Sequence, residues 1–177
     1  MNLTFKPLEK QDFQILLGWL SKPHVKAWYD KEIKYTIEKV QQKYNSYTEG
    51  YKLEEGVKKP IHAFIVLIDN IPIGYVQYYN AHDFPREDGI MLKELPQKLS
   101  AFDIFIGEED YTGKGIGSEI IKTLLKDYIW KEFDACFVDV DADNVRAIKT
   151  YEKAGFIKIK NVGQNIWMMC KNGGDLR

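Results

Sequence analysis

The chain has 177 residues, of which 45% are hydrophobic and 14% aromatic, which is enough for one full core within the usual size of a single domain. Its 25 basic and 26 acidic residues nearly cancel, so no overall charge directs it to nucleic acid or to an anionic membrane surface. The N-terminus has no apolar run of signal-peptide length, and no stretch approaches the roughly 18 to 20 apolar residues that span a bilayer. We therefore expect one soluble, cytoplasmic domain over residues 1–177.

The N-terminal third predicts one strand and two helices. Residues 3–7 form the strand, and Asp12 then opens a helix, with Trp19 on a face next to the apolar one. The apolar side chains of this helix recur at helical spacing, at Phe13, Leu16, Leu17 and Leu20. A second helix covers residues 36–47, where Thr36 caps the first turn. Its apolar stripe consists of Ile37, Val40, Tyr44 and Tyr47.

The middle of the chain predicts a β-hairpin followed by a long loop. Two β-rich runs, residues 61–68 and 71–79, are separated by the turn-forming pair Asp69 and Asn70. Residues 81–100 follow neither the helical nor the strand period, and loops of this length in compact domains are often functional. We expect this loop to act as a substrate lid.

The remaining elements alternate between strands and helices. Further strands are expected at residues 101–107, 136–140, 156–159 and 166–170, with helices at 115–130 and 144–154. This order predicts an α+β architecture around one mixed sheet. Cys136 and Cys170 fall in apolar strand segments without metal-ligand spacing, and the histidines are scattered, so we expect buried free thiols and no metal site.

Three glycines lie where a predicted strand passes into a helix, in Tyr111-Thr-Gly-Lys-Gly-Ile-Gly-Ser118. Backbone N–H groups in such a loop can approach an anion at the positive end of the helix, which favours phosphate binding. The segment lacks both the closing Gly-Lys-Ser/Thr of kinase-type nucleotide loops and the glycine spacing of the dinucleotide fingerprint. A tight turn without a ligand is the structural alternative.

A second motif stands downstream, Asn144-Val-Arg-Ala-Ile-Lys-Thr-Tyr-Glu-Lys-Ala-Gly-Phe156. It resembles the GNAT superfamily motif Asn-x-x-Ala-x-x-x-Tyr-x-x-x-Gly-Phe at every defined position. The glycine segment resembles the loop of the same superfamily that holds the pyrophosphate of acetyl-CoA, Gln/Arg-x-x-Gly-x-Gly/Ala, except that Thr112 replaces Gln/Arg. The resemblance implies a single GNAT-like domain with a mixed, mostly antiparallel central sheet flanked by helices, and acetyl-CoA as co-substrate without a metal.

The same resemblance implies a set of cofactor contacts. Backbone N–H groups near Ile104 and Ile106 help to bind pantetheine or the thioester oxygen. Asn144 either caps its helix or hydrogen-bonds the pantetheine arm, and Ala147 shares a helical face with Tyr151. The pyrophosphate contacts come from Thr112, Gly113, Lys114, Gly115, Ile116, Gly117 and Ser118.

Two side chains are candidates for proton transfer. The departing CoA thiolate must be protonated, and the phenol of Tyr151 is our candidate general acid, with packing against the sheet as the alternative. Asp103 interrupts an otherwise apolar strand, where a buried carboxylate is costly. It is suited to attract an amine, orient it and accept its proton, with a solvent-facing aspartate at a strand end as the alternative.

Three further segments resemble the aminoglycoside 6′-N-acetyltransferase branch of this superfamily. They are Trp19-Leu-Ser-Lys-Pro-His-Val-Lys-Ala-Trp-Tyr29, Ile71-Pro-Ile-Gly-Tyr75 and Asp103-Ile-Phe-Ile-Gly107. The resemblance implies a small cationic aminosugar as acceptor, with Asp103 binding the reacting amine, Asp139 as a second acidic contact, and Tyr29 and Tyr44 lining the sugar site. For Tyr44, core packing is the alternative. The 81–100 loop departs from the acidic loop of that branch, although Asp83, Glu87 and Asp88 offer similar groups.

Other functions stay open at this level. The acceptor could be a siderophore precursor or another metabolite amine, because related branches share the glycine loop and differ at the acceptor pocket. A non-catalytic acyl-CoA-binding module is the third reading. No nucleic-acid or membrane partner is expected, the protein is expected to be a monomer or homodimer, and an aminoglycoside acceptor would connect it with antibiotic resistance.

Overall fold

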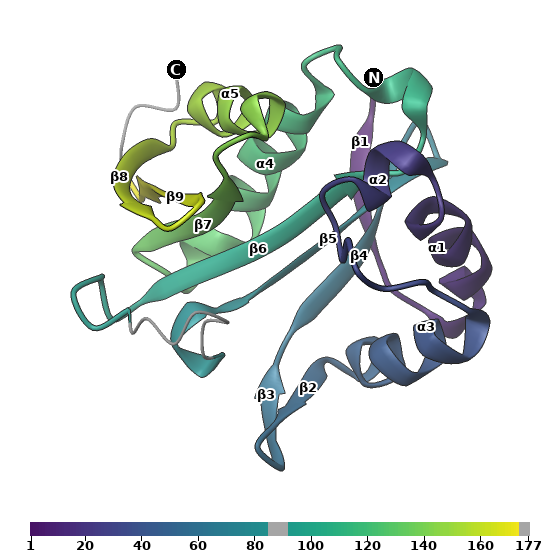
Figure 1. The fold of residues 1–177 in the computed structure, drawn as a ribbon. Coiled ribbons are helices and arrows are strands. Elements are labelled where there is room, and N and C mark those ends of the chain that lie inside the picture. The colour runs from purple at the N-terminus through teal and green to yellow at the C-terminus, as the bar shows by residue number, and fades with distance from the viewer. Residues whose placement is uncertain (85–91, 174–177) are drawn as a thin grey trace. The chain divides into compact units, whose positions relative to one another are not determined.

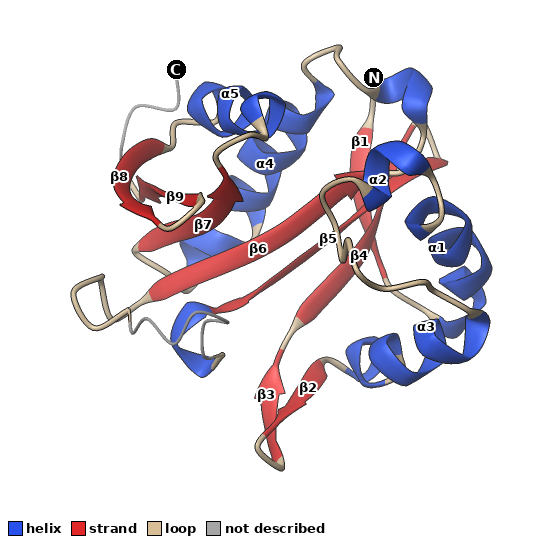
Figure 2. Ribbon diagram, in the orientation of Figure 1, coloured by secondary structure: helices blue, strands red, loops and turns tan. Residues whose placement is uncertain are grey.

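The computed structural model describes residues 1–84 and 92–173 (Figure 1). Seven strands form one sheet in the order β1-β4-β5-β6-β7-β9-β8, and β2 (Tyr51–Glu54) pairs with β3 (Val57–Pro60) in a separate hairpin. The β6–β7 pair is parallel, whereas β1–β4, β7–β9 and β8–β9 are antiparallel, so the predicted mixed, mostly antiparallel sheet is confirmed. The helices that accompany the strands are blue in Figure 2.

The chain divides into two compact units. The first consists of Met1–Gln77 and Asp103–Thr112, and the second holds Tyr78–Phe102 and the segment from Gly113 onward. Strands β5 (Ile71–Asn80) and β6 (Leu99–Ile106) each contribute to both units. The single domain expected over residues 1–177 stays a prediction.

The first unit contains the predicted N-terminal elements. Strand β1 (Leu3–Pro7) pairs antiparallel with β4 (His62–Ile68), and helices α1 (Phe13–Leu20), α2 (Pro23–Lys26) and α3 (Ile37–Tyr44) follow β1 in the chain. The hairpin of β4 and β5 turns at Asp69 and Asn70, whose φ angles of 50° and 67° are those that tight hairpin turns require. Thr36 caps α3 by accepting a hydrogen bond from the Lys39 amide at 3.4 Å. The hairpin and the cap are therefore confirmed.

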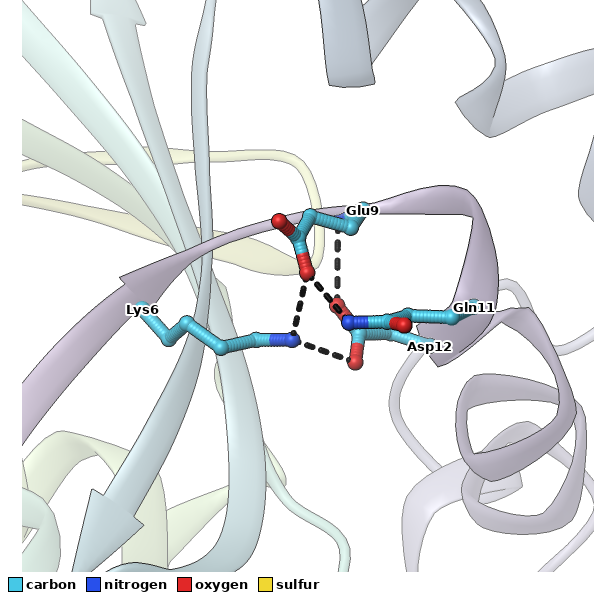
Figure 3. Close-up of polar contacts among 4 residues, drawn as sticks. All are labelled: Lys6, Glu9, Gln11 and Asp12. Atoms are coloured by element: carbon cyan, nitrogen blue, oxygen red, sulfur yellow. Dashed lines mark hydrogen bonds and ion pairs between the residues drawn. The ribbon is translucent and has the colours of Figure 1, made fainter.

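A small polar cluster connects β1 to α1 (Figure 3). The Lys6 ammonium lies 2.7 Å from Asp12 Oδ1 and 3.1 Å from Glu9 Oε2, and Gln11 also donates to Glu9. The Glu9 amide donates to Asp12 Oδ2 at 2.9 Å, which completes a capping box. The cluster fixes the direction in which the chain enters α1.

The face assigned to Trp19 is corrected by the structure. Trp19 is only 1% exposed, whereas Leu17 is half-buried, so the indole rather than Leu17 belongs to the core face of α1. The indole Nε1 donates to Glu108 Oε1 at 2.7 Å, and the ring meets Phe105 edge-on with centroids 6.3 Å apart. The hydrogen bond to Glu108 satisfies the single polar atom of the buried indole.

Gly107 lies against this tryptophan, which gives a direct test of the packing. A Cβ at Gly107 would lie 2.1 Å from Trp19 Cγ, so Gly107→Ala is expected to lower the free energy of unfolding by about 3 kcal/mol through overpacking. Gly18→Ala is the matched control, because nothing lies within 4 Å of a Cβ there and alanine favours the helix by about 0.5–1 kcal/mol. Urea unfolding measures both. Equal stabilities for the two variants would contradict the packing of Trp19 on Gly107.

The second unit contains the C-terminal elements. Helix α4 (Ile116–Asp127) precedes β7 (Ala135–Asp141), and helix α5 (Val145–Lys153) precedes β8 (Ile157–Val162) and β9 (Asn165–Lys171). Its core contains Leu99, Ala101, Ala135, Phe137 and Trp167. Cys136 and Cys170 are buried, free and directly opposite each other on β7 and β9, which confirms the predicted thiols. Burial raises the pKa of both.

Other elements differ from expectation at their ends. Strand β6 begins two residues earlier than predicted, and the sequence did not indicate α2 or the β2–β3 hairpin. The 81–100 segment starts with a 3₁₀ turn at Ala81–Asp83, whereas Glu87 and Asp88 lie outside the described residues.

Within residues 1–84 and 92–173, no helix is long and apolar enough to cross a bilayer.

Candidate active site

In the first unit, Asp103 is held by a chain of buried polar groups. Gln77 Nε2 donates to Asp103 Oδ2 at 2.7 Å, and Tyr75 Oη donates to Gln77 Oε1 at 2.6 Å. Tyr75 and Gln77 are two residues apart on β5 and therefore point to the same face of the sheet. Tyr75 is fully buried, Gln77 is 6% exposed and Asp103 is half-buried. The buried amide fixes the orientation of the carboxylate and stabilises its charge.

A cluster of aromatic rings lies in the same unit as this carboxylate. Tyr29 meets Phe105 edge-on with centroids 4.9 Å apart, and Phe105 stacks on Tyr75 at 5.5 Å. Tyr44 packs edge-on against Tyr75 at 5.5 Å. Burial, with the charge of neighbouring acidic groups that include Asp103, raises the pKa of Tyr29, Tyr44 and Tyr75 above its ordinary value. These phenols are therefore uncharged at neutral pH.

The two tyrosines assigned to the sugar site differ in their exposure. Tyr29 is half-buried and can offer part of its ring to a ligand. Tyr44 is 0% exposed, between the rings of Tyr47 and Tyr75, which agrees with the core-packing alternative. Of the two, we therefore retain Tyr29 alone as a candidate ligand contact.

The end of β6 is shaped by close backbone contacts. A Cβ at Gly74 would lie 2.4 Å from the carbonyl oxygen of Phe105, so this position requires glycine. The amides of Gly107 and Glu108 both donate to the Ile73 carbonyl, at 2.8 and 3.0 Å, and His24 Nε2 lies 3.0 Å from the Ile106 carbonyl oxygen. Ile104 and Ile106 are half-buried. Cofactor binding by their amides stays a prediction.

Thr112 ends a 3₁₀ turn just before the glycines. Its hydroxyl donates to the Glu109 carbonyl at 2.6 Å, and its amide donates to the same oxygen at 2.9 Å. Both donors therefore close the turn at Glu109–Tyr111. This capping role explains why a threonine suits a position where the GNAT loop has Gln or Arg.

In the second unit, the glycine loop forms the start of α4. Gly113 and Gly115 have φ angles of 76° and 80°, in the left-handed region that favours glycine, and Gly115 is the N-cap residue. Ser118 Oγ donates to the Gly115 carbonyl at 2.7 Å. Gly113, Lys114 and Gly115 are exposed. The first amides of a helix have no acceptor within it, so this exposed turn presents donors to an anion.

A guanidinium from α5 lies beside the same loop. A Cβ at Gly113 would lie 3.6 Å from Arg146 Nη2, and Arg146 is exposed. The positive charge of Arg146 therefore lies beside the loop that carries Lys114. Arg146 could not be expected from the sequence, because it occupies an undefined position of the linear motif, which does not show which way that side chain faces.

The second motif forms α5, as predicted. Asn144 Oδ1 accepts a hydrogen bond from the Ala147 amide at 3.1 Å, so of its two expected roles Asn144 has the helix cap. Tyr151 is half-buried, and its ring lies 5.9 Å from the rings of both Phe102 and Phe156. Asp139 is half-buried on β7, opposite Trp167 of β9. The catalytic role of Tyr151 and the ligand role of Asp139 stay predictions.

The predicted residues thus fall into two groups. In the first unit, Asp103 lies on the strand whose Phe105 meets the ring of Tyr29. In the second unit, the glycine loop lies beside Arg146 of α5. The described part of the chain contains no cluster of three or more His, Cys, Asp or Glu side chains placed to hold a metal.

Comparison with known proteins decides the family. The model of the acetyltransferase (GNAT) domain matches residues 9–163. The chain belongs to the GNAT acetyltransferase family. The two predicted motifs lie inside the matched region, and the predicted GNAT fold is confirmed.

Among curated proteins, this GNAT chain is similar to two named aminoglycoside N(6′)-acetyltransferase type 1, from Klebsiella pneumoniae and Serratia marcescens. Each is 27% identical over 158 residues, which cover 88% of this chain and 74% of the relative. The structure of AAC(6′)-Ib with ribostamycin and coenzyme A superposes with a TM-score of 0.83 at 24% identity, covering 98% of this chain and 95% of the other. Spermidine N-acetyltransferase from Vibrio cholerae superposes with a TM-score of 0.72 at 18% identity, covering 99% and 98%.

The structure also identifies site residues that sequence reasoning missed. Gln77 is the polar side chain in the apolar run Tyr75–Tyr79. A polar residue in such a run is a signal in the sequence that could have indicated Gln77 as a candidate site residue. Its contact with Asp103 connects positions that are 26 residues apart, so the pairing depends on the sheet and not on any local motif. Asp30, Tyr35 and Lys43 form a second charged and aromatic group in the same unit.

Proposed function

We propose that this GNAT chain transfers an acetyl group from acetyl-CoA to a primary amine of a cationic aminosugar, the 6′-amine of an aminoglycoside. The observation that carries the proposal is the Asp103 carboxylate, oriented by Gln77 on the strand whose Phe105 meets the ring of Tyr29. A carboxylate pairs with an ammonium group, and an aromatic face supplies apolar and cation–π contact to a sugar amine. The names of the curated relatives and the ligands in the AAC(6′)-Ib structures support the same acceptor class.

The proposed reaction assigns proton transfers to two side chains. Asp103 accepts a proton from the acceptor amine, directly or through water, so that the nitrogen lone pair can attack the thioester carbonyl carbon. A C–N bond forms, and the C–S bond then breaks. The CoA thiolate takes a proton from the Tyr151 phenol, and the acylated nitrogen gives its second proton to the resulting phenolate, directly or through water. Asp103 releases its proton to solvent, so the products are an N-acetylated amine, free CoA and one proton. Asp139 would supply a second acidic contact to the acceptor.

On the donor side, the amides of Gly113 to Ser118 would hold the pyrophosphate, with positive charge from Lys114 and Arg146. Asn144 and Ala147 would serve mainly by building the first turn of α5, because the Asn144 side chain is engaged as its cap. The amides of Ile104 and Ile106 would bind the pantetheine arm. We also place this activity in the cytoplasm, and an aminoglycoside acceptor would make the protein a resistance enzyme.

Arg146 gives a separate test of the donor site. Arg146→Ala is expected to raise KM for acetyl-CoA about tenfold with little change in kcat, since one charge-assisted phosphate contact is lost. Steady-state assays should show no such loss when acetyl-pantetheine, which lacks phosphates, is the donor. Lys149→Ala, an exposed cation on the same helix, is the matched control. An equal loss with both donors would show that Arg146 acts on the fold and not on the phosphates.

The acceptor is tested with purified protein, acetyl-CoA and a panel containing aminoglycosides, spermidine and hydroxamate-type siderophore precursors. We expect CoA release with aminoglycosides and mass-spectrometric detection of a product monoacetylated at the 6′-amine. Acetylation of another amine alone would refute the aminoglycoside assignment and keep the reaction class. Calorimetric binding of CoA without acetylation of any amine would favour the non-catalytic alternative.

A further inference from the structure

Lys43 of α3 occupies an aromatic and anionic site in the first unit. Its ammonium lies 2.6 Å from Asp30 Oδ2 and 3.1 Å from Tyr35 Oη. It also lies 5.2 Å from the ring centroids of Tyr29 and Tyr44, and 5.8 Å from that of Tyr35. A carboxylate with aromatic faces is the combination that binds an ammonium ligand. Here a lysine of the chain itself holds that position.

Asp30 is set in place by an uncommon backbone conformation. Its φ angle is 47°, in the left-handed region that few residues other than glycine adopt. Its carboxylate accepts hydrogen bonds from both the Tyr35 hydroxyl and the Lys43 ammonium. The side chains of Asp30 and Lys43 are 26% and 28% exposed, so solvent only partly screens the pair. The conformation and the two hydrogen bonds fix the carboxylate under the ammonium.

Tyr29 connects this pair with the proposed acceptor site. Lys43 stands over the Tyr29 ring, and the same ring meets Phe105 edge-on. Phe105 lies two residues from Asp103 on β6 and therefore on the same face of that strand. An acceptor whose amine pairs with Asp103 and whose ring covers Tyr29 would bring its other substituents toward Lys43.

We propose that Lys43 and Asp30 determine how many positive charges an acceptor can carry near Tyr29. The inference rests on the proposed function and extends it to substrate selection. Lys43 neutralises Asp30 and repels a second ammonium group at this position, so acceptors with a single ammonium near the reacting amine are favoured. Without Lys43, Asp30 would be available to pair with that second group.

Two small ligands with the same reacting amine test this selection: 6-amino-6-deoxyglucose and 2,6-diamino-2,6-dideoxyglucose. The measurement is the ratio of their calorimetric dissociation constants, diamine over monoamine. Lys43→Met is expected to lower this ratio about tenfold relative to wild type, through one new charge-assisted contact and the loss of one repulsion. Lys43→Arg should keep the wild-type ratio. Lys39→Met, which removes an exposed charge one turn away on α3, is the control and should also keep it.

Asp30→Asn gives an independent arm that does not depend on the stability of the Lys43 variants. Asparagine tolerates the left-handed conformation, and loss of the carboxylate should raise the same ratio, because Lys43 is then uncompensated. An unchanged ratio in both Lys43→Met and Asp30→Asn would overturn the inference, as would an equal loss of affinity for both sugars. CoA release is measured separately. A shifted ratio without CoA release would contradict the proposed acetyl transfer but not the selection by charge. CoA release without a shifted ratio would contradict the selection by charge but not the acetyl transfer.

Discussion

Replacing Asp103 by asparagine is expected to lower kcat/KM for the acceptor amine by roughly 10²- to 10⁴-fold, the usual contribution of a general base. The substitution keeps the size of the side chain and leaves an amide oxygen that can still accept the hydrogen bond from Gln77 Nε2. It removes the charge that pairs with the ammonium group and the oxygen that takes its proton. CoA release with saturating acetyl-CoA measures the loss.

The design of this experiment separates chemistry from folding. Because the hydrogen bond to Gln77 can persist, the thermal unfolding midpoint of Asp103→Asn should stay close to that of wild type. Asp134→Asn removes an exposed carboxylate elsewhere and is the matched control for the change in net charge. Turnover of Asp103→Asn within threefold of wild type would refute the assignment of Asp103 as the base.

The sequence predicted those parts of the fold that local physics decides. Asp69 and Asn70 are residue types that tolerate positive φ, so these two positions were enough to predict the turn between β4 and β5. Thr36 and Asn144 stand where an oxygen side chain must accept from the first turn of a helix, and both do so. Gly115 likewise marks the start of α4 because of its positive φ. Each of these features depends on neighbouring residues.

The features that the sequence did not predict depend on residues far apart in the chain. The burial of Trp19 requires Gly107 and Glu108, and its hydrogen bond to Glu108 joins residues that are 89 positions apart. The β2–β3 hairpin consists of short strands without a buried apolar face, so neither an alternating pattern nor a hydrophobic run indicates it.

The candidate site also combines local features with contacts between distant residues. Motif resemblance proposed Asp103, Tyr29 and the glycine loop as site residues, because each belongs to a contiguous segment. It could not indicate Gln77 or Lys43, whose contacts with Asp103 and Tyr29 form only when other strands and helices bring these residues together. Resemblance also gave Tyr44 the same role as Tyr29, although burial separates the two. Packing therefore refines which aromatic side chains can meet a ligand.

Replacing Tyr151 by phenylalanine is expected to lower kcat by roughly 10²-fold or more, because the departing thiolate loses its proton donor. The ring itself remains, so its edge contact with Phe102 and its tilted contact with Phe156 should persist. The affinity for acetyl-CoA, measured by calorimetry, is expected to stay within about threefold of wild type, a difference below 1 kcal/mol. The loss is therefore expected in kcat and not in the affinity for acetyl-CoA. A proton-transfer role of Tyr151 requires this result, whereas a packing role does not.

Tyr128→Phe is the matched control, since Tyr128 is also a half-buried tyrosine of the second unit whose ring lies near another ring, that of Tyr78. Removing the hydroxyl group of Tyr128 should leave kcat unchanged. If Tyr151→Phe and Tyr128→Phe have equal turnover, the hydroxyl of Tyr151 has no part in the chemistry and the thiolate takes its proton from water. If Tyr151→Phe instead loses stability and acetyl-CoA affinity together, its hydroxyl supports the fold of α5. A fall in kcat alone leaves proton donation as the explanation, because the phenol oxygen is the only non-hydrogen atom that the substitution removes.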